Sequence, residues 1–374
     1  MPKISVLLTS FNHEKYICEA IDSVLNQTFT DFELIILDDA SSDDSWRLIS
    51  QYSDPRIKAF RNEMNGDDKY KLNNAISEIS LGVYIAIHHS DDVWALDKLE
   101  KQIAFLEEHP EVGAVFTDAL AIAEDSSPLI DNQHFYSSIF EQPNRTRHEW
   151  LRFFFIRCNA LCHPSVLIRK ACFDACGLYS YSMIQLPDLD MWIRLCLEYE
   201  IHVLPEKLVR FRVRDNKENA SASRPDSRIR HQYEFCKALQ NYRKIKEFDE
   251  LIKIFSSAEK YCRNEETDMD FVLGMIALEE KPFTVTTLFG LDILFEIISD
   301  SKRAANIRRL YDFDYKSFTA LTGQYDIFSV ELPIRYEEMR ERYEGISGSL
   351  SWRVIAPIHY ASSKARNIIG IFTR

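Results

Sequence analysis

The sequence lacks the features that mark membrane-spanning and disulfide-rich secreted proteins. No apolar run reaches the roughly 18 residues that a membrane-spanning helix needs, because Asp292 interrupts the longest candidate, residues 283–298. No secretory signal precedes the first strand-like run, and eight cysteines in 374 residues are too sparse for a disulfide framework. We therefore expect a cytoplasmic protein with reduced thiols and no membrane span.

Positive charge is also scarce. The formal net charge is −13, with 45 lysines and arginines against 58 acids, which argues against nucleic acid as a general partner. No Gly-x-Gly-x-x-Gly and no Gly-Lys-Ser/Thr loop occurs, so the common dinucleotide and phosphate loops are absent. An anionic nucleotide ligand would need a local cation, either a metal ion or a few arginines.

Four cysteines have a spacing that invites a zinc hypothesis. Cys158, Cys162, Cys172 and Cys176 form two Cys-x₃-Cys pairs. The stretch between the pairs is strand-like and lacks the glycine-rich turns of zinc knuckles. We expect free thiols in the core.

The first hundred residues alternate between strand-like and helix-like segments. Strand-like runs lie at 4–9, 32–37, 57–61 and 83–87, and helical spacing lies at 16–27, 46–52, 71–80 and from about Trp94 to His109. Such alternation predicts an α/β fold with a mostly parallel sheet and helices on both faces.

The later part of the chain is mainly helical. We expect an α/β domain over residues 1–225, a mainly helical region over 226–344 with strand-like alternation only at 323–332, and a basic tail over 345–374. The tail contains four cationic residues and no acid. Peripheral contact with an anionic membrane is one interpretation of it, and docking on the protein's own helices is the other.

Polar residues follow three of the strand-like runs. They are Thr9 and Asn12, then Asp38 and Asp39, and finally His89, Asp91 and Asp92. Ligands of open α/β sheets bind beyond the carboxyl ends of the strands, and paired carboxylates suit a hard divalent cation that carries phosphate. A helix cap would also explain the Asp pair taken alone, but three such loops at equivalent strand ends favour a nucleotide site.

Several motifs in a fixed order carry a family resemblance. They are residues 4–12, 20–28 and 32–41, the Ser90-Asp91-Asp92 turn with Lys98-Leu99, and residues 163–169 and 187–192. In this order they resemble the inverting family 2 glycosyltransferases of GT-A fold, over residues 3–215, of the type that builds bacterial polysaccharides. The resemblance implies the Rossmann-like sheet of nucleotide-diphospho-sugar transferases.

The resemblance also implies a role for each residue on the donor side. Thr9 and Asn12 would line the nucleotide pocket, Asp39 would accept hydrogen bonds from the base, and Asp38 would support its loop. Asp91 would face the ribose or sugar. Asp92, with Asp91, would bind Mn²⁺ or Mg²⁺ bridging the diphosphate.

On the acceptor side, the resemblance assigns the general base to Asp188, with Asp190 in reserve. A cap of the helix that follows is the alternative for both residues. The acceptor would be a carbohydrate or a lipid-linked glycan, with the enzyme at the inner face of the cell membrane.

The chain departs from the family pattern at two positions. His89 stands where relatives commonly have an acid, and it is either a ligand better suited to Mn²⁺ than to Mg²⁺ or a plain loop residue. Pro187 stands where an acid often precedes the base. In addition, Arg212 and Arg214 would either neutralise the diphosphate or lie on a solvated edge.

Two other functions remain as alternatives. A sugar nucleotidyltransferase uses a similar sheet but normally needs a glycine-rich basic loop after the first strand, which residues 9–12 lack. A non-catalytic scaffold would bind partners through the helical C-terminal region, although Asp39, Asp91, Asp92 and Asp188 are all present.

Overall fold

The computed structural model describes residues 1–66, 68–129, 134–215, 219, 221–280 and 283–348. The chain forms two compact units, Met1–Phe313 and Asp314–Arg374. The expected division at residues 225 and 226 lies inside the first unit, whose helices after this point pack on those before it. Of the expected tail at 345–374, the part from 349 onward lies outside the described residues.

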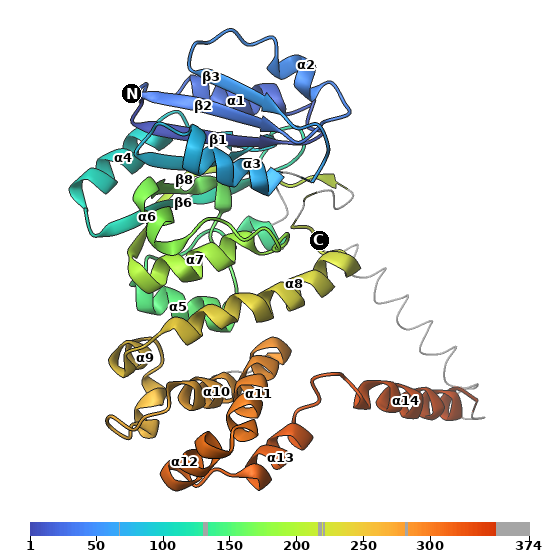
Figure 1. The fold of residues 1–374 in the computed structure, drawn as a ribbon. Helices are drawn as coiled ribbons and strands as arrows, with labels where there is room; N and C mark the ends of the chain where they lie inside the picture. Colours follow the sequence, from blue (N-terminus) through green and yellow to red (C-terminus); the bar gives the residue numbers. More distant parts are fainter. Residues whose placement is uncertain (67, 130–133, 216–218, 220, 281–282, 349–374) are drawn as a thin grey trace, which may run out of the picture. The chain divides into compact units, whose positions relative to one another are not determined.

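The first unit is built around an eight-stranded sheet with the order β3-β2-β1-β4-β7-β6-β8-β5 (Figure 1). The strands are β1 (Ile4–Ser10), β2 (Phe32–Asp38), β3 (Ile57–Arg61), β4 (Tyr84–His89), β5 (Val93–Trp94), β6 (Val112–Ile122), β7 (Leu167–Arg169) and β8 (Glu200–Arg212). Four of the seven pairs of neighbouring strands are parallel, and three of these four are the pairs β3-β2, β2-β1 and β1-β4. The predicted mostly parallel α/β sheet is confirmed, with β7 and β5 as the antiparallel insertions.

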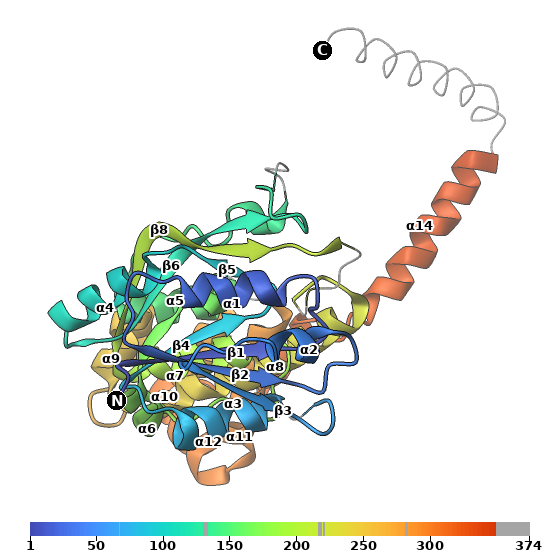
Figure 2. The same cartoon turned by 90° about the horizontal axis from the view of Figure 1, so that it is seen from above.

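Helices cover both faces of the sheet. They are α1 (Ile17–Leu25), α2 (Ser45–Ile49), α3 (Asp68–Asn74), α4 (Lys98–Glu108), α5 (Arg147–Arg157), α6 (Lys170–Cys176) and α7 (Pro187–Glu198). From β1 the chain runs outward through β2 to β3, and it then returns to form β4 on the other side of β1. Right-handed crossovers therefore put α1 and α3 on opposite faces, as Figure 2 shows. The strand order reverses between β1 and β4, and this is where open α/β sheets bind ligands.

Burial explains why these segments become strands and helices. All residues of β2 are buried, as expected for a strand covered on both faces. In α1 the residues Ile17, Ala20, Ile21 and Val24 are fully buried at helical spacing. Gly82 lets the chain enter β4 beside β1, because a Cβ there would lie 2.5 Å from the backbone nitrogen of Ser5.

Two sequence expectations were wrong. Trp94 does not begin a helix: Val93 and Trp94 form β5, which pairs antiparallel with β8, and α4 begins at Lys98. No strand forms at 323–332, where the chain leaves α13 (Tyr315–Gln324) and enters α14 (Glu331–Gly348). In the first place, pairing with β8 outweighed the helical pattern of the sequence. In the second, no strand of the described residues pairs with the segment.

The first unit ends in a layer of helices. These are α8 (Pro225–Leu239), α9 (Phe248–Ile254), α10 (Met269–Glu279), α11 (Thr284–Ser299) and α12 (Ser301–Tyr311). Helices α10 and α11 pack closely through two glycines, since a Cβ on Gly290 would lie 2.7 Å from the carbonyl oxygen of Gly274.

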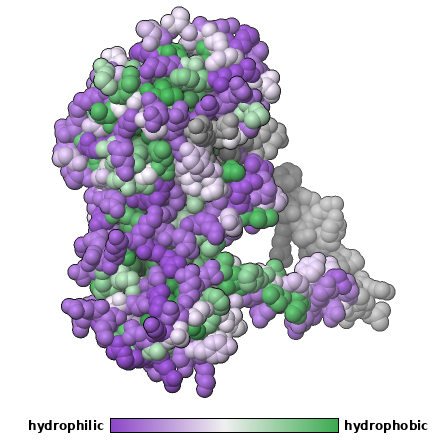
Figure 3. Space-filling view, viewed as in Figure 1, coloured by the Kyte–Doolittle hydropathy of each residue, from purple (hydrophilic) through white to green (hydrophobic). Residues whose placement is uncertain are grey.

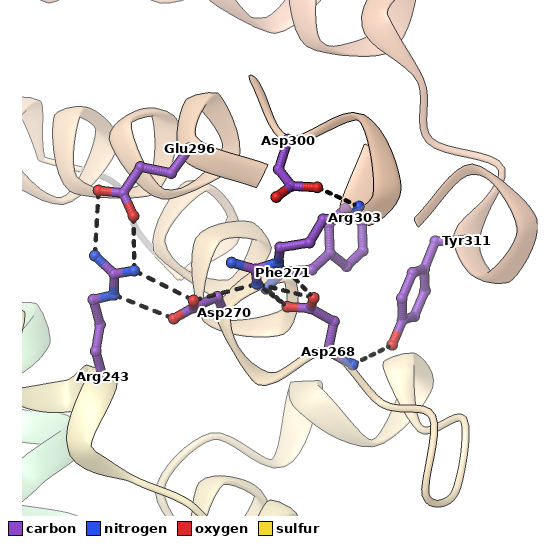
Figure 4. Close-up of polar contacts among 8 residues, drawn as sticks. All are labelled: Arg243, Asp268, Asp270, Phe271, Glu296, Asp300, Arg303 and Tyr311. Carbon is purple, nitrogen blue, oxygen red and sulfur yellow. Dashed lines mark hydrogen bonds and ion pairs between the residues drawn. The ribbon is translucent and has the colours of Figure 1, made fainter. Parts of the chain in front are cut away.

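An ion-pair network ties these helices together (Figure 4). Arg243 lies 3.2 Å from Asp270 of α10 and 2.8 Å from Glu296 of α11. Arg303 of α12 lies 2.7 Å from Asp268, which also caps α10. Because two arginines share three acids across several elements, the network helps to fix the order of the helices.

The second unit contains α13 and α14 among its described residues. No helix in the described part of the chain is both long and apolar enough to cross a membrane. On the face of the first unit that Figure 3 shows, hydrophilic residues predominate and apolar residues are scattered.

Candidate functional site

The loops after β1 and β2 are joined into one polar platform. Register places Thr9 opposite Leu37 and His89, so the carboxyl ends of β1, β2 and β4 lie side by side. Asn12 has a left-handed backbone (φ 52°), and its side-chain oxygen accepts a 2.8 Å hydrogen bond from the Ser42 amide. Thr9 and Asn12 therefore stand at the strand edge that the sequence predicted.

The two acids after β2 have different surroundings. Asp38 is fully buried and accepts hydrogen bonds from the amide (3.0 Å) and hydroxyl (2.5 Å) of Ser41, which closes the loop. Asp39 is 8% exposed and accepts from the Asn62 amide at 2.7 Å and from the Gly66 backbone at 3.0 Å. Each carboxylate oxygen can accept more than one hydrogen bond, so Asp39 keeps acceptor capacity.

The loop after β4 contains a candidate metal centre. His89, Asp91 and Asp92 offer ligand atoms that all lie within 4.8 Å of one another. Asp92 is 1% exposed. Its Oδ1 accepts a 2.8 Å hydrogen bond from the Arg212 backbone amide, whereas its Oδ2 is buried without a hydrogen-bond donor.

A bound cation would balance the negative charge of the buried Oδ2 atom of Asp92. Burial, and then the neighbouring charge of Asp91, raise the pKa of the Asp92 carboxyl well above its usual range. A buried carboxylate oxygen without a hydrogen-bond donor is costly, and a divalent ion would supply the missing positive charge. The Nδ1 atom of His89 lies 3.7 Å from Oδ2, so the donor set combines oxygen with imidazole nitrogen, which suits Mn²⁺ better than Mg²⁺.

His13 is a site residue that the sequence reasoning missed. Its Nδ1 lies 2.7 Å from the Ser90 hydroxyl, and its Nε2 lies 2.9 Å from the Arg214 guanidinium and 3.9 Å from Asp91. A guanidinium can only donate, so Nε2 accepts and the ring proton sits on Nδ1. No short-range pattern could reveal this contact, because the two residues are 201 positions apart.

Arg212 and Arg214 have distinct environments. The Arg212 guanidinium is buried, donates to the Asp91 carbonyl at 2.7 Å and pairs with Glu19 at 2.6 Å. With its backbone amide on Asp92, Arg212 braces the acidic loop from behind. Arg214 lies beyond the end of β8, where its guanidinium contacts His13.

Asp188 and Asp190 share the first turn of α7 but not their surroundings. Asp190 is 6% exposed and forms a 2.8 Å ion pair with Arg194 and a 2.8 Å hydrogen bond with Asn241. Asp188 is partly exposed and accepts a 2.6 Å hydrogen bond from the side chain of Asn159. The buried ion pair makes Asp190 a structural residue and leaves Asp188 as the accessible carboxylate.

Cys162 connects the two acidic regions. Burial raises the pKa of its thiol well above the usual range, and the charges of Asp92 and of Asp188 contribute to this shift. The flanking residues make direct contacts with both regions, since the ring of His163 lies 5.2 Å from that of His89 and Asn159 donates to Asp188 at 2.6 Å. The structure brings the candidate base and the candidate metal centre to the same part of the molecule.

The zinc hypothesis gains no support from the structure. All eight cysteines are free thiols, and Cys162 and Cys172 are buried. Within the described residues, the one group with metal-binding geometry is His89, Asp91 and Asp92. The predicted burial of the four cysteines holds for Cys162 and Cys172, whereas Cys158 and Cys176 are only partly buried.

Comparison with known proteins identifies the family that the sequence motifs resemble. Residues 5–169 match the sequence model of "Glycosyl transferase family 2". The chain is 30% identical over 200 residues to the putative glycosyltransferase EpsE of Bacillus subtilis, which covers 52% of this chain and 66% of EpsE. It is 27% identical over 195 residues to WfaP of Escherichia coli, a UDP-Glc:alpha-D-GlcNAc-diphosphoundecaprenol beta-1,3-glucosyltransferase, which covers 52% of this chain and 70% of WfaP.

A solved structure shares the fold. The crystal structure of Staphylococcus aureus TarS 1–349 in complex with UDP superposes with a TM-score of 0.53. The sequences are 17% identical, and the match covers 84% of this chain and 93% of TarS 1–349.

Proposed function

This chain is a member of glycosyl transferase family 2 with a GT-A fold, and we propose that it transfers a glycosyl group from a nucleoside-diphosphate sugar to an acceptor hydroxyl, with inversion at the anomeric carbon. The observation that carries the proposal is the buried, unpartnered Oδ2 atom of Asp92. It lies beside Asp91 at the point where the strand order reverses. A cation held there would be positioned to meet a diphosphate.

The donor would occupy the platform formed by the β1, β2 and β4 loops. Asp39 would accept hydrogen bonds from the base, while Thr9 and Asn12 would line the nucleotide pocket. Asp38 would keep the loop closed through Ser41.

The metal centre would lie at the diphosphate end of the donor. Asp92 and Asp91 would hold Mn²⁺ or Mg²⁺, with His89 as a further ligand. When bound, the ion would stabilise the negative charge of the departing diphosphate. Arg214 would add positive charge on the same side, and Arg212 would position the acidic loop.

Asp188 would act as the general base. Its carboxylate would take the proton of the acceptor hydroxyl while the hydroxyl oxygen attacks the anomeric carbon. The new glycosidic bond forms as the bond to the diphosphate breaks on the opposite side, which inverts the configuration. The hydrogen bond from Asn159 holds one Asp188 oxygen in place.

We place the reaction in bacterial polysaccharide assembly at the cytoplasmic face of the membrane. The acceptor would be a carbohydrate or a lipid-linked glycan, and the name of WfaP, with its diphosphoundecaprenol acceptor, supports the second class. The basic tail at 345–374 would then contact the anionic membrane surface.

A thermal-shift panel of nucleotide sugars, each with and without Mn²⁺, tests the proposal. UDP-glucose and UDP-GlcNAc come first, because WfaP and a TarS complex carry these names. We expect a Mn²⁺-dependent rise in melting temperature with one donor, and release of nucleoside diphosphate when acceptor is added. Release of pyrophosphate from a nucleoside triphosphate and a sugar 1-phosphate, tested in parallel, would instead indicate a nucleotidyltransferase, and no response to any nucleotide would indicate a scaffold.

A further inference from the structure

Helix α14, whose course Figure 1 shows, carries a row of large apolar side chains that are exposed. Leu332, Tyr336, Met339 and Tyr343 are each between 64% and 68% exposed. Apolar residues also gather on the visible face where the chain enters α14 (Figure 3). A helix that formed only a solvated connection would have no need of such side chains.

These four residues lie on one face of the helix. Their separations are 4, 3 and 4 positions, and with about 100° of rotation per residue such spacing forms a stripe along the axis. Ile334 is also exposed, at 58%, but it falls on the opposite side.

Charges are sorted around this stripe. Arg335 and Arg342 follow one edge and Arg340 the other, whereas the five glutamates of the helix all lie farther from the stripe, toward its opposite side. Some of the arginines are shared with acids behind them, since Arg340 lies 2.9 Å from Glu337 and Arg335 lies 2.5 Å from Glu331. The apolar stripe is thus bordered by cations and backed by anions.

The arginine edges disfavour pairing with a second copy of the helix. In a two-helix coiled coil the stripe would occupy the a and d positions, and Arg335, Arg340 and Arg342 would occupy e and g. Parallel pairing would set e against g, and antiparallel pairing would set like positions together, so arginine would meet arginine in both cases. A matching surface must instead be apolar in the middle and negative at its edges.

We propose that the α14 stripe docks on a membrane surface containing anionic phospholipid. Such a surface offers an acyl boundary for Leu332 and Met339, an interfacial zone that suits the two tyrosines, and phosphates for the arginines. Arginine side chains can extend sideways to headgroups while their stems lie on apolar surface. In the sequence the next 26 residues add four cations and no acid, so the charge of the following segment has the same preference.

Vesicle co-sedimentation of the full-length protein tests this inference. We compare phosphatidylcholine vesicles with vesicles that also contain phosphatidylglycerol, and expect binding to the second that weakens as salt is raised. Met339→Glu should lower the partition coefficient at least about tenfold, because it places a charge in the buried stripe. Ile334→Glu is the matched control, with the same added charge on the opposite face, and should change binding little.

A second pair of variants separates charge from apolar contact. Arg335→Gln together with Arg342→Gln should reduce binding to the anionic vesicles by about 25-fold, at roughly fivefold per arginine. Circular dichroism checks that each variant keeps its fold.

Several outcomes would overturn the proposal. These are equal loss of binding in the Met339 and Ile334 variants, no dependence on phosphatidylglycerol, and a dimer in light scattering that Met339→Glu dissolves. Binding is measured without donor or acceptor, so failure here leaves the proposed sugar transfer untouched, and failed transfer leaves this inference untouched.

Discussion

Replacing Asp92 by asparagine is the most direct perturbation of the proposed metal centre. The substitution keeps the size of the side chain, and its oxygen can still accept the hydrogen bond from the Arg212 amide that Oδ1 now accepts at 2.8 Å. What it removes is the buried Oδ2 atom that has no donor. The variant therefore separates cation binding from folding.

Asp92→Asn should affect the stability of the Mn²⁺-loaded protein and of the metal-free protein in opposite directions. With Mn²⁺ at about 100 times its dissociation constant, the wild type should gain about 2.7 kcal/mol, or roughly 5 °C in melting temperature. Loss of a direct ligand should weaken Mn²⁺ binding by at least about 100-fold, since even residues behind the ligands matter by 10- to 100-fold. The gain should then fall to about 0.4 kcal/mol or less.

Without metal, the variant should be at least as stable as the wild type. The folded-state pKa of Asp92 is raised, chiefly by burial, so the unfolded chain loses its proton first as the pH rises. Wild-type stability should therefore fall from about pH 4, the unfolded value, up to the raised folded pKa. Asparagine has no proton to lose, so the difference should grow in favour of the variant across this window.

The assay is differential scanning fluorimetry of both proteins over pH 4–8, with and without Mn²⁺, followed by donor turnover. Asp97→Asn is the matched control, because Asp97 is a nearby acid that pairs with Lys101 at 2.7 Å on the surface. It should keep the full Mn²⁺ response. An undiminished Mn²⁺ shift or turnover in Asp92→Asn would refute the metal assignment, and a large loss of metal-free stability would refute the view that Asp92 is held at a cost.

Three further substitutions distinguish chemistry from structure. Asp188→Asn should lower the rate of transfer by about 10²- to 10⁴-fold while donor binding by calorimetry stays within twofold, and lost binding would point to a structural cap. Asp190→Asn should instead lower the free energy of unfolding by about 3 kcal/mol, measured in urea, because it leaves Arg194 buried without its ion pair; an unchanged midpoint would contradict this. Gly290→Ala should cost about 1–3 kcal/mol in the same assay, because the new Cβ would meet the Gly274 carbonyl at 2.7 Å, and a neutral result would mean that α10 and α11 can move apart freely.

Some assignments depended on contacts that no local pattern contains. Asp188 and Asp190 are equivalent in sequence, both acids in the first turn of one helix. Only the partners Arg194, Asn241 and Asn159 separate a buried ion pair from an accessible carboxylate. In the sequence, Arg212 and Arg214 are also equivalent, as alternate residues near a strand end. Only burial in the folded protein distinguishes them.

Other features were predicted wrongly or not at all from the sequence, because residues that are neighbours only in the folded chain determine them. Val93 and Trp94 are strand residues because β8 lies beside them, and the alternation at 323–332 forms no strand within the described residues. His13 joined the site through contacts with Ser90 and Arg214, which are far away along the chain.

The sequence by itself determined the alternation of strands and helices, the three polar loops at their ends and the family. These depend on periodic burial and on short segments, both of which are written locally in the chain. Only the tertiary structure decided that one Asp92 oxygen is buried without a donor, that Arg212 braces the loop, and that Asn159 holds Asp188. Burial and electrostatics depend on which distant residues meet, and that is a property of the folded chain alone.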